Sequence, residues 1–162
     1  MLQEIPKDEN GFLNSCNGWP YGGFREWLVL CDNCARGFGL AEWQAPQHIY
    51  WLMADEVPVG MAKLQLAHNR TMAQANYTIR PTCRNMGYGT QLLGLLIQEA
   101  QTQGIGQLSL TVLRHNAYSL KIVQAHGGVI VKTTAQRYEL GIDCTQTTNV
   151  QQNTQQERWM DA

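Results

Sequence analysis

Hydrophobic residues recur along the chain with two different periods, and the period changes near the middle of the sequence. Between residues 49 and 79 bulky residues alternate with small or polar ones, as in half-buried strands. The alternation predicts strands at 49–53, 57–66 and 75–79, with Val57, Val59 and Met61 on one face of the second strand. Asp55 and Glu56 separate the first two strands, which indicates a hairpin.

After Pro81 the spacing becomes that of helices. Leu92, Leu93, Leu96 and Ile97 mark one buried face of a helix over 88–101, which Gly104 ends. Shorter patterns predict helices at 24–35 and 118–125 and strands at 108–112, 129–131 and 137–140. Residues 1–23 are rich in turn-forming residues, so we expect an irregular segment laid over the surface.

The order of these elements predicts an α/β (α+β) fold, with a mixed, mostly antiparallel sheet flanked by helices. A chain of 162 residues suits one domain, which we place at 1–143. Residues 144–162 are rich in Gln, Thr and Asn, and we expect them to form a disordered tail or one ordered only by a partner.

Charge and cysteine content narrow the classes of function. Lys and Arg number 12 against 13 Asp and Glu, a balance that argues against nucleic-acid binding and against a polybasic membrane anchor. The sequence shows neither a membrane-spanning run nor a signal peptide, so we expect a cytoplasmic protein. The five cysteines are then reduced thiols, and the lone Cys31-x-x-Cys34 predicts no metal site.

One turn carries the chemistry of binding. The strand that ends at Ile79 is followed by Arg84-x-x-Gly87-x-Gly89 and then by the long helix, whose first turn contains no Asp or Glu. Free backbone N–H groups at such a helix start attract anions, usually phosphate. Glycine lets the backbone approach a ligand closely, and Arg84 can add a charged fork. By spacing alone, a simple tight turn remains an alternative.

These motifs resemble the acetyl-CoA loop of the GNAT acyltransferases. Leu108–Val112 is similar to the next strand of that family, and Asn116 with Ser119 and Gly127-Gly128 to its following signature. The resemblance covers residues 5–140, and the segment 5–12 with the 87–90 turn is similar to a bacterial subgroup of predicted acetyltransferases.

The resemblance implies a splay between the family's fourth and fifth strands and acetyl-CoA as co-substrate, with no metal. The backbone of Thr78 and Ile79 would pair with the pantetheine arm, and the Ile79 N–H would stabilise the oxyanion. Asn116 and Ser119 would line the far side of the arm. The pyrophosphate would be held by the amides of one continuous loop, Arg84, Asn85, Met86, Gly87, Tyr88, Gly89 and Thr90.

Two positions depart from the family pattern, and both concern proton transfer. The family often has a tyrosine seven residues after the Asn, where this chain has Val123, and often a glutamate base on its fourth strand. No acid occurs here between Glu56 and Glu99. His68 is therefore the candidate base. Other candidates for proton transfer are His115, Tyr77, Tyr118, Glu26 and Glu42.

The expected function is N-acetyl transfer from acetyl-CoA to a primary amine, by direct attack in a ternary complex. The amine would be a small molecule or a peptide, and the protein a monomer or homodimer. A protein that binds acyl-CoA as a sensor or scaffold, with little turnover, is the alternative, since the usual acid and base are missing.

Overall fold

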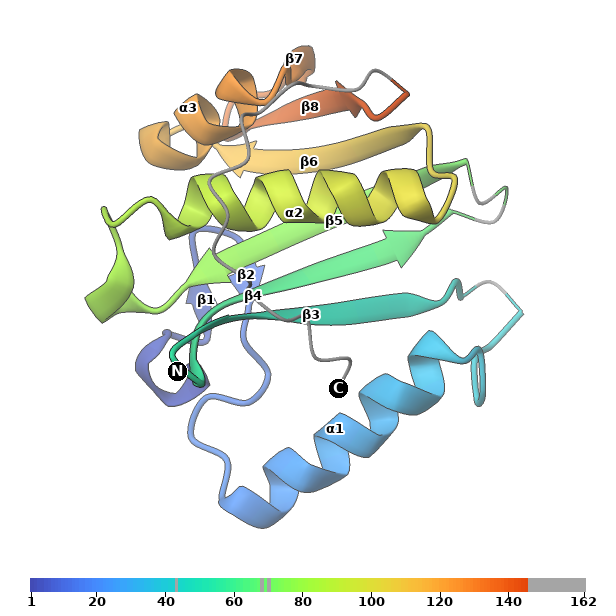
Figure 1. The fold of residues 1–162 in the computed structure, drawn as a ribbon, viewed down its shortest axis with the longest axis vertical. Coiled ribbons are helices and arrows are strands. Elements are labelled where there is room, and N and C mark those ends of the chain that lie inside the picture. Colours follow the sequence, from blue (N-terminus) through green and yellow to red (C-terminus); the bar gives the residue numbers. More distant parts are fainter. Residues whose placement is uncertain (43, 68, 70, 146–162) are drawn as a thin grey trace.

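The computed structural model describes residues 1–145, except residues 43, 68 and 70. Figure 1 shows a twisted sheet with the helix α2 lying across its front face. In chain order the elements are η1 (Leu2–Glu4), β1 (Asp8–Glu9), β2 (Phe12–Leu13), α1 (Tyr21–Ala35), β3 (Gln47–Ala54), β4 (Val57–Leu66), β5 (Met72–Ile79), η2 (Pro81–Cys83), α2 (Tyr88–Thr102), β6 (Gln107–Leu113), α3 (Ala117–Ala125), β7 (Val129–Thr133) and β8 (Arg137–Asp143). The sheet order is β3-β4-β5-β6-β8-β7, and β5–β6 is its parallel pair. This mixed, mostly antiparallel sheet confirms the predicted fold class.

The β3–β4 hairpin contains a bulge that the alternation did not reveal. Asp55 and Glu56 form its turn with φ of 48° and 65°, the left-handed conformation of a two-residue type I′ turn. Leu52 pairs with Gly60 but Met53 pairs with Pro58, so Val59 is an extra residue. Val59 therefore packs in the main core while Met61 packs on the other face of the sheet, and the prediction of one shared face was wrong.

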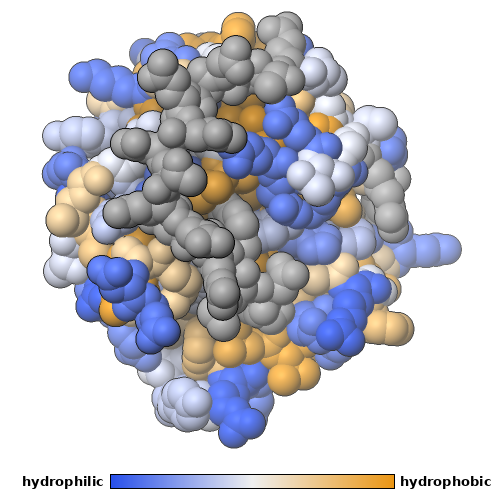
Figure 2. Space-filling model, in the orientation of Figure 1, coloured by the Kyte–Doolittle hydropathy of each residue, from blue (hydrophilic) through white to orange (hydrophobic). Residues whose placement is uncertain are grey.

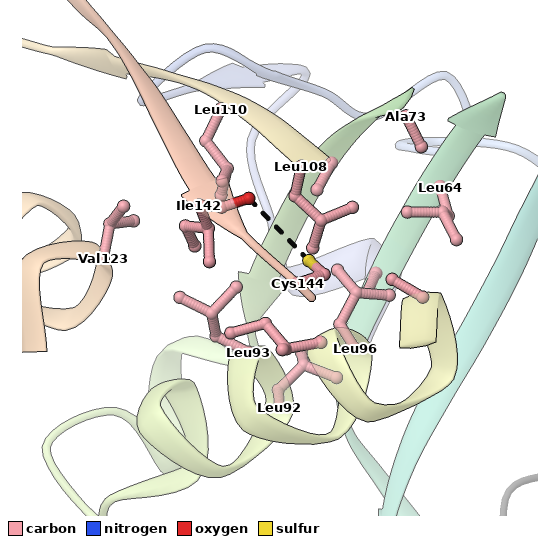
Figure 3. Close-up of a cluster of buried hydrophobic side chains, with 14 of the residues drawn as sticks. Leu64, Ala73, Leu92, Leu93, Leu96, Leu108, Leu110, Val123, Ile142 and Cys144 are labelled. Carbon is pink, nitrogen blue, oxygen red and sulfur yellow. Dashed lines mark hydrogen bonds between the residues drawn. The ribbon is translucent and has the colours of Figure 1, made fainter. Parts of the chain in front are cut away.

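The main core lies between the sheet and α2 (Figure 3). The helix buries the face predicted from its spacing, which consists of Leu92, Leu93, Leu96, Ile97 and Ala100. Leu108 and Leu110 of β6 face these side chains from the sheet. Cys144, placed in the tail by the sequence, belongs to this core and is only 3% exposed. Residues 146–162, which hold the rest of the predicted tail, lie outside the described residues.

The N-terminal segment forms a second core on the opposite face of the sheet. Leu2, Ile5, Phe12 and Cys16 are buried there against Ile49 and Met61, so the segment is more than a surface covering. The side chain of Asn14 organises it, because its Nδ2 donates to the carbonyl oxygens of Leu2 (2.7 Å) and Ile5 (2.8 Å). In Figure 1 the short β1–β2 hairpin lies behind the sheet, and α1 lies beside β3.

The parallel pair β5–β6 separates towards its carboxyl end (Figure 1). Pairing runs from Met72–Gln107 only to Ala75–Leu110, although the strands continue to Ile79 and Leu113. This is the splay that the family resemblance implied. On the face seen in Figure 2, hydrophilic and hydrophobic residues are interspersed.

Candidate active-site cleft

A cleft of about 440 Å³ opens where β5 and β6 separate. Its walls come from the ends of these strands, from the turn before α2, from the start of α3 and from the β1–β2 hairpin. The lining residues are Glu9, Asn10, Phe12, Ala75, Asn76, Tyr77, Thr78, Ile79, Cys83, Arg84, Asn85, Gly87, Gly89, Thr90, Leu110, Thr111, Val112, Asn116, Tyr118, Ser119 and Ile122.

The register of β5 decides which backbone groups face this cleft. The amide of Arg80 donates to Val59 O (2.8 Å), so in an antiparallel ladder the even-numbered residues of β5 bond to β4. On the other side, Gly106 N donates to Thr71 O (2.9 Å), which places the odd-numbered residues towards β6. The backbone groups of Tyr77 and Ile79 thus face the gap, whereas those of Thr78 face β4 opposite Met61. Thr78 therefore lines the cleft without turning its amide to it.

The turn before α2 has two glycines with different physical roles. Gly87 is the N-cap residue with φ +88°, and a Cβ there would meet no atom within 4 Å. Its left-handed backbone, rather than crowding, favours glycine. A Cβ at Gly89 would lie 2.9 Å from Ile122 Cδ1, so Gly89 allows α2 to pack closely against α3. The first helical turn contains no acidic residue, and its N–H groups keep the positive end of the helix dipole at the cleft.

Asn116 and Ser119 close the far side of the cleft at the start of α3. Asn116 is the N-cap residue, since its Oδ1 accepts a hydrogen bond from Ser119 N (3.2 Å). The Ser119 hydroxyl lies 3.1 Å from the Tyr77 hydroxyl, which links α3 to β5. Burial raises the pKa of Tyr77 above its ordinary value of 10.0, although the bond to Ser119 opposes this. Tyr77 is therefore a protonated phenol at neutral pH.

Arg84 is not a free fork, in contrast to the sequence expectation. Its Nη1 donates to Glu9 Oε1 (3.1 Å), its Nη2 pairs with Glu9 Oε2, and its Nε donates to Ile79 O (3.1 Å). The guanidinium thus joins the β1–β2 hairpin to the end of β5. An incoming anion meets a positive group that a carboxylate already neutralises.

The structure brings most of the predicted binding residues to one cleft. Those that line it are Thr78, Ile79, Arg84, Asn85, Gly87, Gly89, Thr90, Asn116 and Ser119. Met86 is 67% exposed and Tyr88 packs against the main core, so neither side chain is part of the lining.

The candidates for proton transfer are more scattered. His68 lies outside the described residues. His115, Glu26 and Glu42 are exposed and do not line the cleft, whereas Tyr77 and Tyr118 do. Val123, at the position of the family's usual tyrosine, is fully buried in the main core.

Sequence reasoning missed Glu9, Asn10 and Phe12. Asn10-Gly11 is the strongest hairpin dipeptide, and Asn10 has the positive φ (53°) of such a turn. The flanking strands have two residues each, too short to show an alternation. Among the described residues that line the cleft, Glu9 is the only carboxylate and Arg84 the only lysine or arginine.

The described part of the chain contains no group of three or more His, Cys, Asp or Glu side chains arranged to hold a metal ion. None of its helices is both long and apolar enough to cross a membrane.

Comparison with known proteins places the chain among acetyltransferases. The model of the acetyltransferase (GNAT) family matches residues 14–127. Acetyltransferase Pat of Mycolicibacterium smegmatis is 29% identical over 103 residues, which are 61% of this chain but only 29% of Pat. The chain therefore spans less than a third of that relative's length.

Solved structures share the fold at low sequence identity. The N-acetyltransferase PseH of Campylobacter jejuni has a TM-score of 0.58 at 16% identity, over 76% of this chain and 82% of PseH. The structure of yncA from Salmonella typhimurium, which holds its cofactor acetyl-CoA, has a TM-score of 0.51 at 17% identity, over 61% and 65% of the two chains.

Proposed function

This chain belongs to the GNAT acetyltransferase family, and we propose that it moves an acetyl group from acetyl-CoA to a primary amine. The amine attacks the thioester directly in a ternary complex. The observation that carries the proposal is the meeting of three features in one cleft. They are the splay beyond Ala75–Leu110, the acid-free start of α2, and the outward-facing backbone of Tyr77 and Ile79.

Acetyl-CoA fits the polar groups of the cleft. In our proposal its pyrophosphate binds the amides of residues 84–90, where the helix dipole and the missing acids favour negative charge. Because Glu9 neutralises the guanidinium of Arg84, the backbone amides provide most of the binding of the pyrophosphate. The pantetheine amides pair with the backbone of Tyr77 and Ile79, since the ladder turns these groups towards the gap. Asn116 and Ser119 border the arm on the α3 side.

The chemical step uses position and electrostatics. The Ile79 N–H donates to the thioester oxygen as negative charge develops there, the kind of stabilisation that preorganised donors provide. The cleft holds the amine near the carbonyl, which supplies much of the rate gain without any covalent intermediate.

Proton transfer uses weak or indirect groups. We propose that the amine loses its proton through water or to a weak base, with His68 the candidate residue. The partly buried, protonated hydroxyl of Tyr77 is one group within the cleft that can return a proton to the departing thiolate.

An acyl-CoA-binding sensor with little turnover remains a second candidate function. Its support is Val123, which packs into the core at the position where the family often has its proton-donating tyrosine. The two functions share a binding site and differ in turnover, so one pair of measurements separates them. Release of free thiol from acetyl-CoA across a panel of amines indicates transfer, whereas CoA binding by calorimetry without thiol release indicates a sensor.

A matched pair of variants tests where CoA binds. Gly87 and Gly104 both have positive φ (+88° and +73°) and open space around the position of a Cβ, but Gly104 lies beyond the far end of α2. Both substitutions by Glu carry the same backbone strain and charge. We expect Gly87→Glu to abolish CoA binding in calorimetry and Gly104→Glu to leave it unchanged. Equal CoA affinity in two folded variants would contradict the proposed site.

A further inference from the structure

We propose that Glu9 is a positioning residue of the active site, which acts through Arg84 on the peptide of Ile79. This inference rests on the proposed function, in which the Ile79 N–H is the oxyanion donor. It goes further by giving the β1–β2 hairpin a part in the chemical step. Glu9 itself touches neither thioester nor amine in this scheme.

The contacts form a short chain from the hairpin to the reacting centre. Both carboxylate oxygens of Glu9 engage the two terminal nitrogens of Arg84, the bidentate geometry that fixes a guanidinium most firmly. The third nitrogen, Nε, donates to the carbonyl oxygen of Ile79 at 3.1 Å. Both side chains are partly buried, with exposures of 23% for Glu9 and 36% for Arg84, so solvent competes less with the pair than on an open surface.

Ile79 needs such support because the sheet has released it on one side. Its backbone faces the gap, where pairing with β6 has already ended at Ala75. On the other side, the amide of Arg80 donates to Val59 O at 2.8 Å. The peptide between Ile79 and Arg80 is thus held by β4 through its N–H and by Arg84 through its C=O. The proposed oxyanion donor, the N–H of Ile79, belongs to the preceding peptide and is joined to this one through the Cα of Ile79. Loss of the bond from Arg84 lets the Ile79–Arg80 peptide tilt about its bond to Val59, which moves that Cα and its N–H.

A second ion pair provides a built-in comparison. Glu4, in the same N-terminal segment, pairs with Arg80 at 2.7 Å and with similar exposures of 34% and 29%. Arg80 and Glu4 both lie outside the cleft lining. Glu4 also lies 3.6 Å from the N-terminal amino group, so if the two pairs merely tie the N-terminal segment to the segment after β5, removal of the Glu4 carboxylate has at least as large an effect as removal of that of Glu9. If Glu9 positions Ile79, the two removals differ.

The test compares Glu9→Gln with Glu4→Gln in the full chain. In ¹H–¹⁵N spectra of the free protein, we expect Glu9→Gln to shift the Arg84 Nε–H signal and the Ile79 amide and to speed exchange of that Nε–H with water. Glu4→Gln should leave both signals in place. For thiol release with an amine that supports turnover, Glu9→Gln should lower kcat about tenfold, less than the 10²–10³ for a lost oxyanion donor. KM for acetyl-CoA should not rise, since the phosphate loop is intact and the guanidinium of Arg84 is no longer neutralised by a carboxylate.

Arg84→Lys gives an independent check. Lysine keeps the charge but loses the fork and the Nε–H, so it should lower kcat as Glu9→Gln does. The double variant should be no worse than Arg84→Lys alone, because both changes break the same chain of contacts.

Three results would overturn the inference while the wild type is active. They are an unchanged kcat in a folded Glu9→Gln variant, equal losses in Glu9→Gln and Glu4→Gln, and a fall confined to acetyl-CoA affinity. A wild type that neither binds CoA nor releases thiol would instead refute the proposed function, and with it the catalytic part of the inference.

Discussion

The hydroxyl oxygen of Tyr77 lies 3.1 Å from the Oγ of Ser119, and this contact bridges the cleft from β5 to α3. Both groups are partly buried, so neither finds an equally good partner in water once the other is removed. The bond also fixes the phenol beside the proposed path of the pantetheine arm.

A double-mutant cycle measures this contact. Tyr77→Phe and Ser119→Ala should each lower the free energy of unfolding by about 1 kcal/mol, the usual net value of one hydrogen bond. The double variant should lose clearly less than the sum, because the second change removes a group that is already unpartnered. Urea unfolding of the four proteins provides the measurement. Strictly additive losses would mean that the two hydroxyls do not interact.

Cys83 offers a chemical probe of the cleft. It is half-buried and lines the cleft, whereas Cys34 has a similar degree of burial but lies on α1 away from it. With CoA at ten times its Kd, alkylation of Cys83 should slow about tenfold while that of Cys34 is unchanged. Mass spectrometry of the labelled peptides distinguishes the two thiols. Equal slowing of alkylation at Cys83 and Cys34 would indicate that CoA stabilises the whole fold rather than covering the Cys83 thiol directly.

Cys31, which lies on α1 with Cys34, is an internal control for thiol reactivity. Burial raises the pKa of Cys31 to about 12, so little of it is thiolate at neutral pH. It should label much more slowly than Cys34 with or without CoA.

Lys63 gives stability a distinctive dependence on pH. Burial lowers its pKa from 10.5, an effect that nearby Cys31 and Cys16 oppose. As pH rises towards 10.5, the folded chain releases this proton before the unfolded chain does, so the unfolded state binds more protons and stability rises. Relative to Lys63→Met, the wild type should therefore gain stability in urea unfolding as pH rises towards 10.5. A constant difference would show that the ammonium is well solvated.

Two truncations locate the end of the folded domain. Residues 146–162 contain few apolar side chains, so their removal after Thr145 should change Tm by no more than a few degrees. Truncation after Asp143 also removes Cys144, whose side chain is buried and whose amide donates to Gly106 O at 2.9 Å. In this variant the free energy of unfolding should fall by a further ~1–2 kcal/mol, which for a chain of this size lowers Tm by roughly 2–8 °C. Thermal unfolding by circular dichroism compares them.

Elements with long periodic patterns were predictable from the sequence. The α2 helix was expected at 88–101 and spans Tyr88–Thr102, because five buried positions repeat on one face. The Asn116 cap was likewise confirmed, since its side chain accepts from the N–H three residues on. Local rules therefore predicted the two helix starts that border the cleft, but not the β1–β2 hairpin that also lines it.

Features that depend on distant partners were not predictable in the same way. The bulge at Val59 shows only in the register between β3 and β4, and no local signal marks it. Glu9 and Arg84 are 75 residues apart in sequence, so their pairing follows from the tertiary fold alone. The second core formed by residues near the N-terminus was hidden for the same reason, as its apolar residues are too widely spaced to define a period.

The separation of β5 from β6 gives the sheet an internal edge. Beyond Ala75 the β6-facing backbone groups of β5 have lost their strand partner in the middle of the molecule rather than at its rim. A bound extended ligand with amide groups would serve there as a short inserted strand. Amide hydrogen exchange should reveal this asymmetry in the free protein, with slow exchange at Ala75 and faster exchange at Tyr77 two residues further along the same strand.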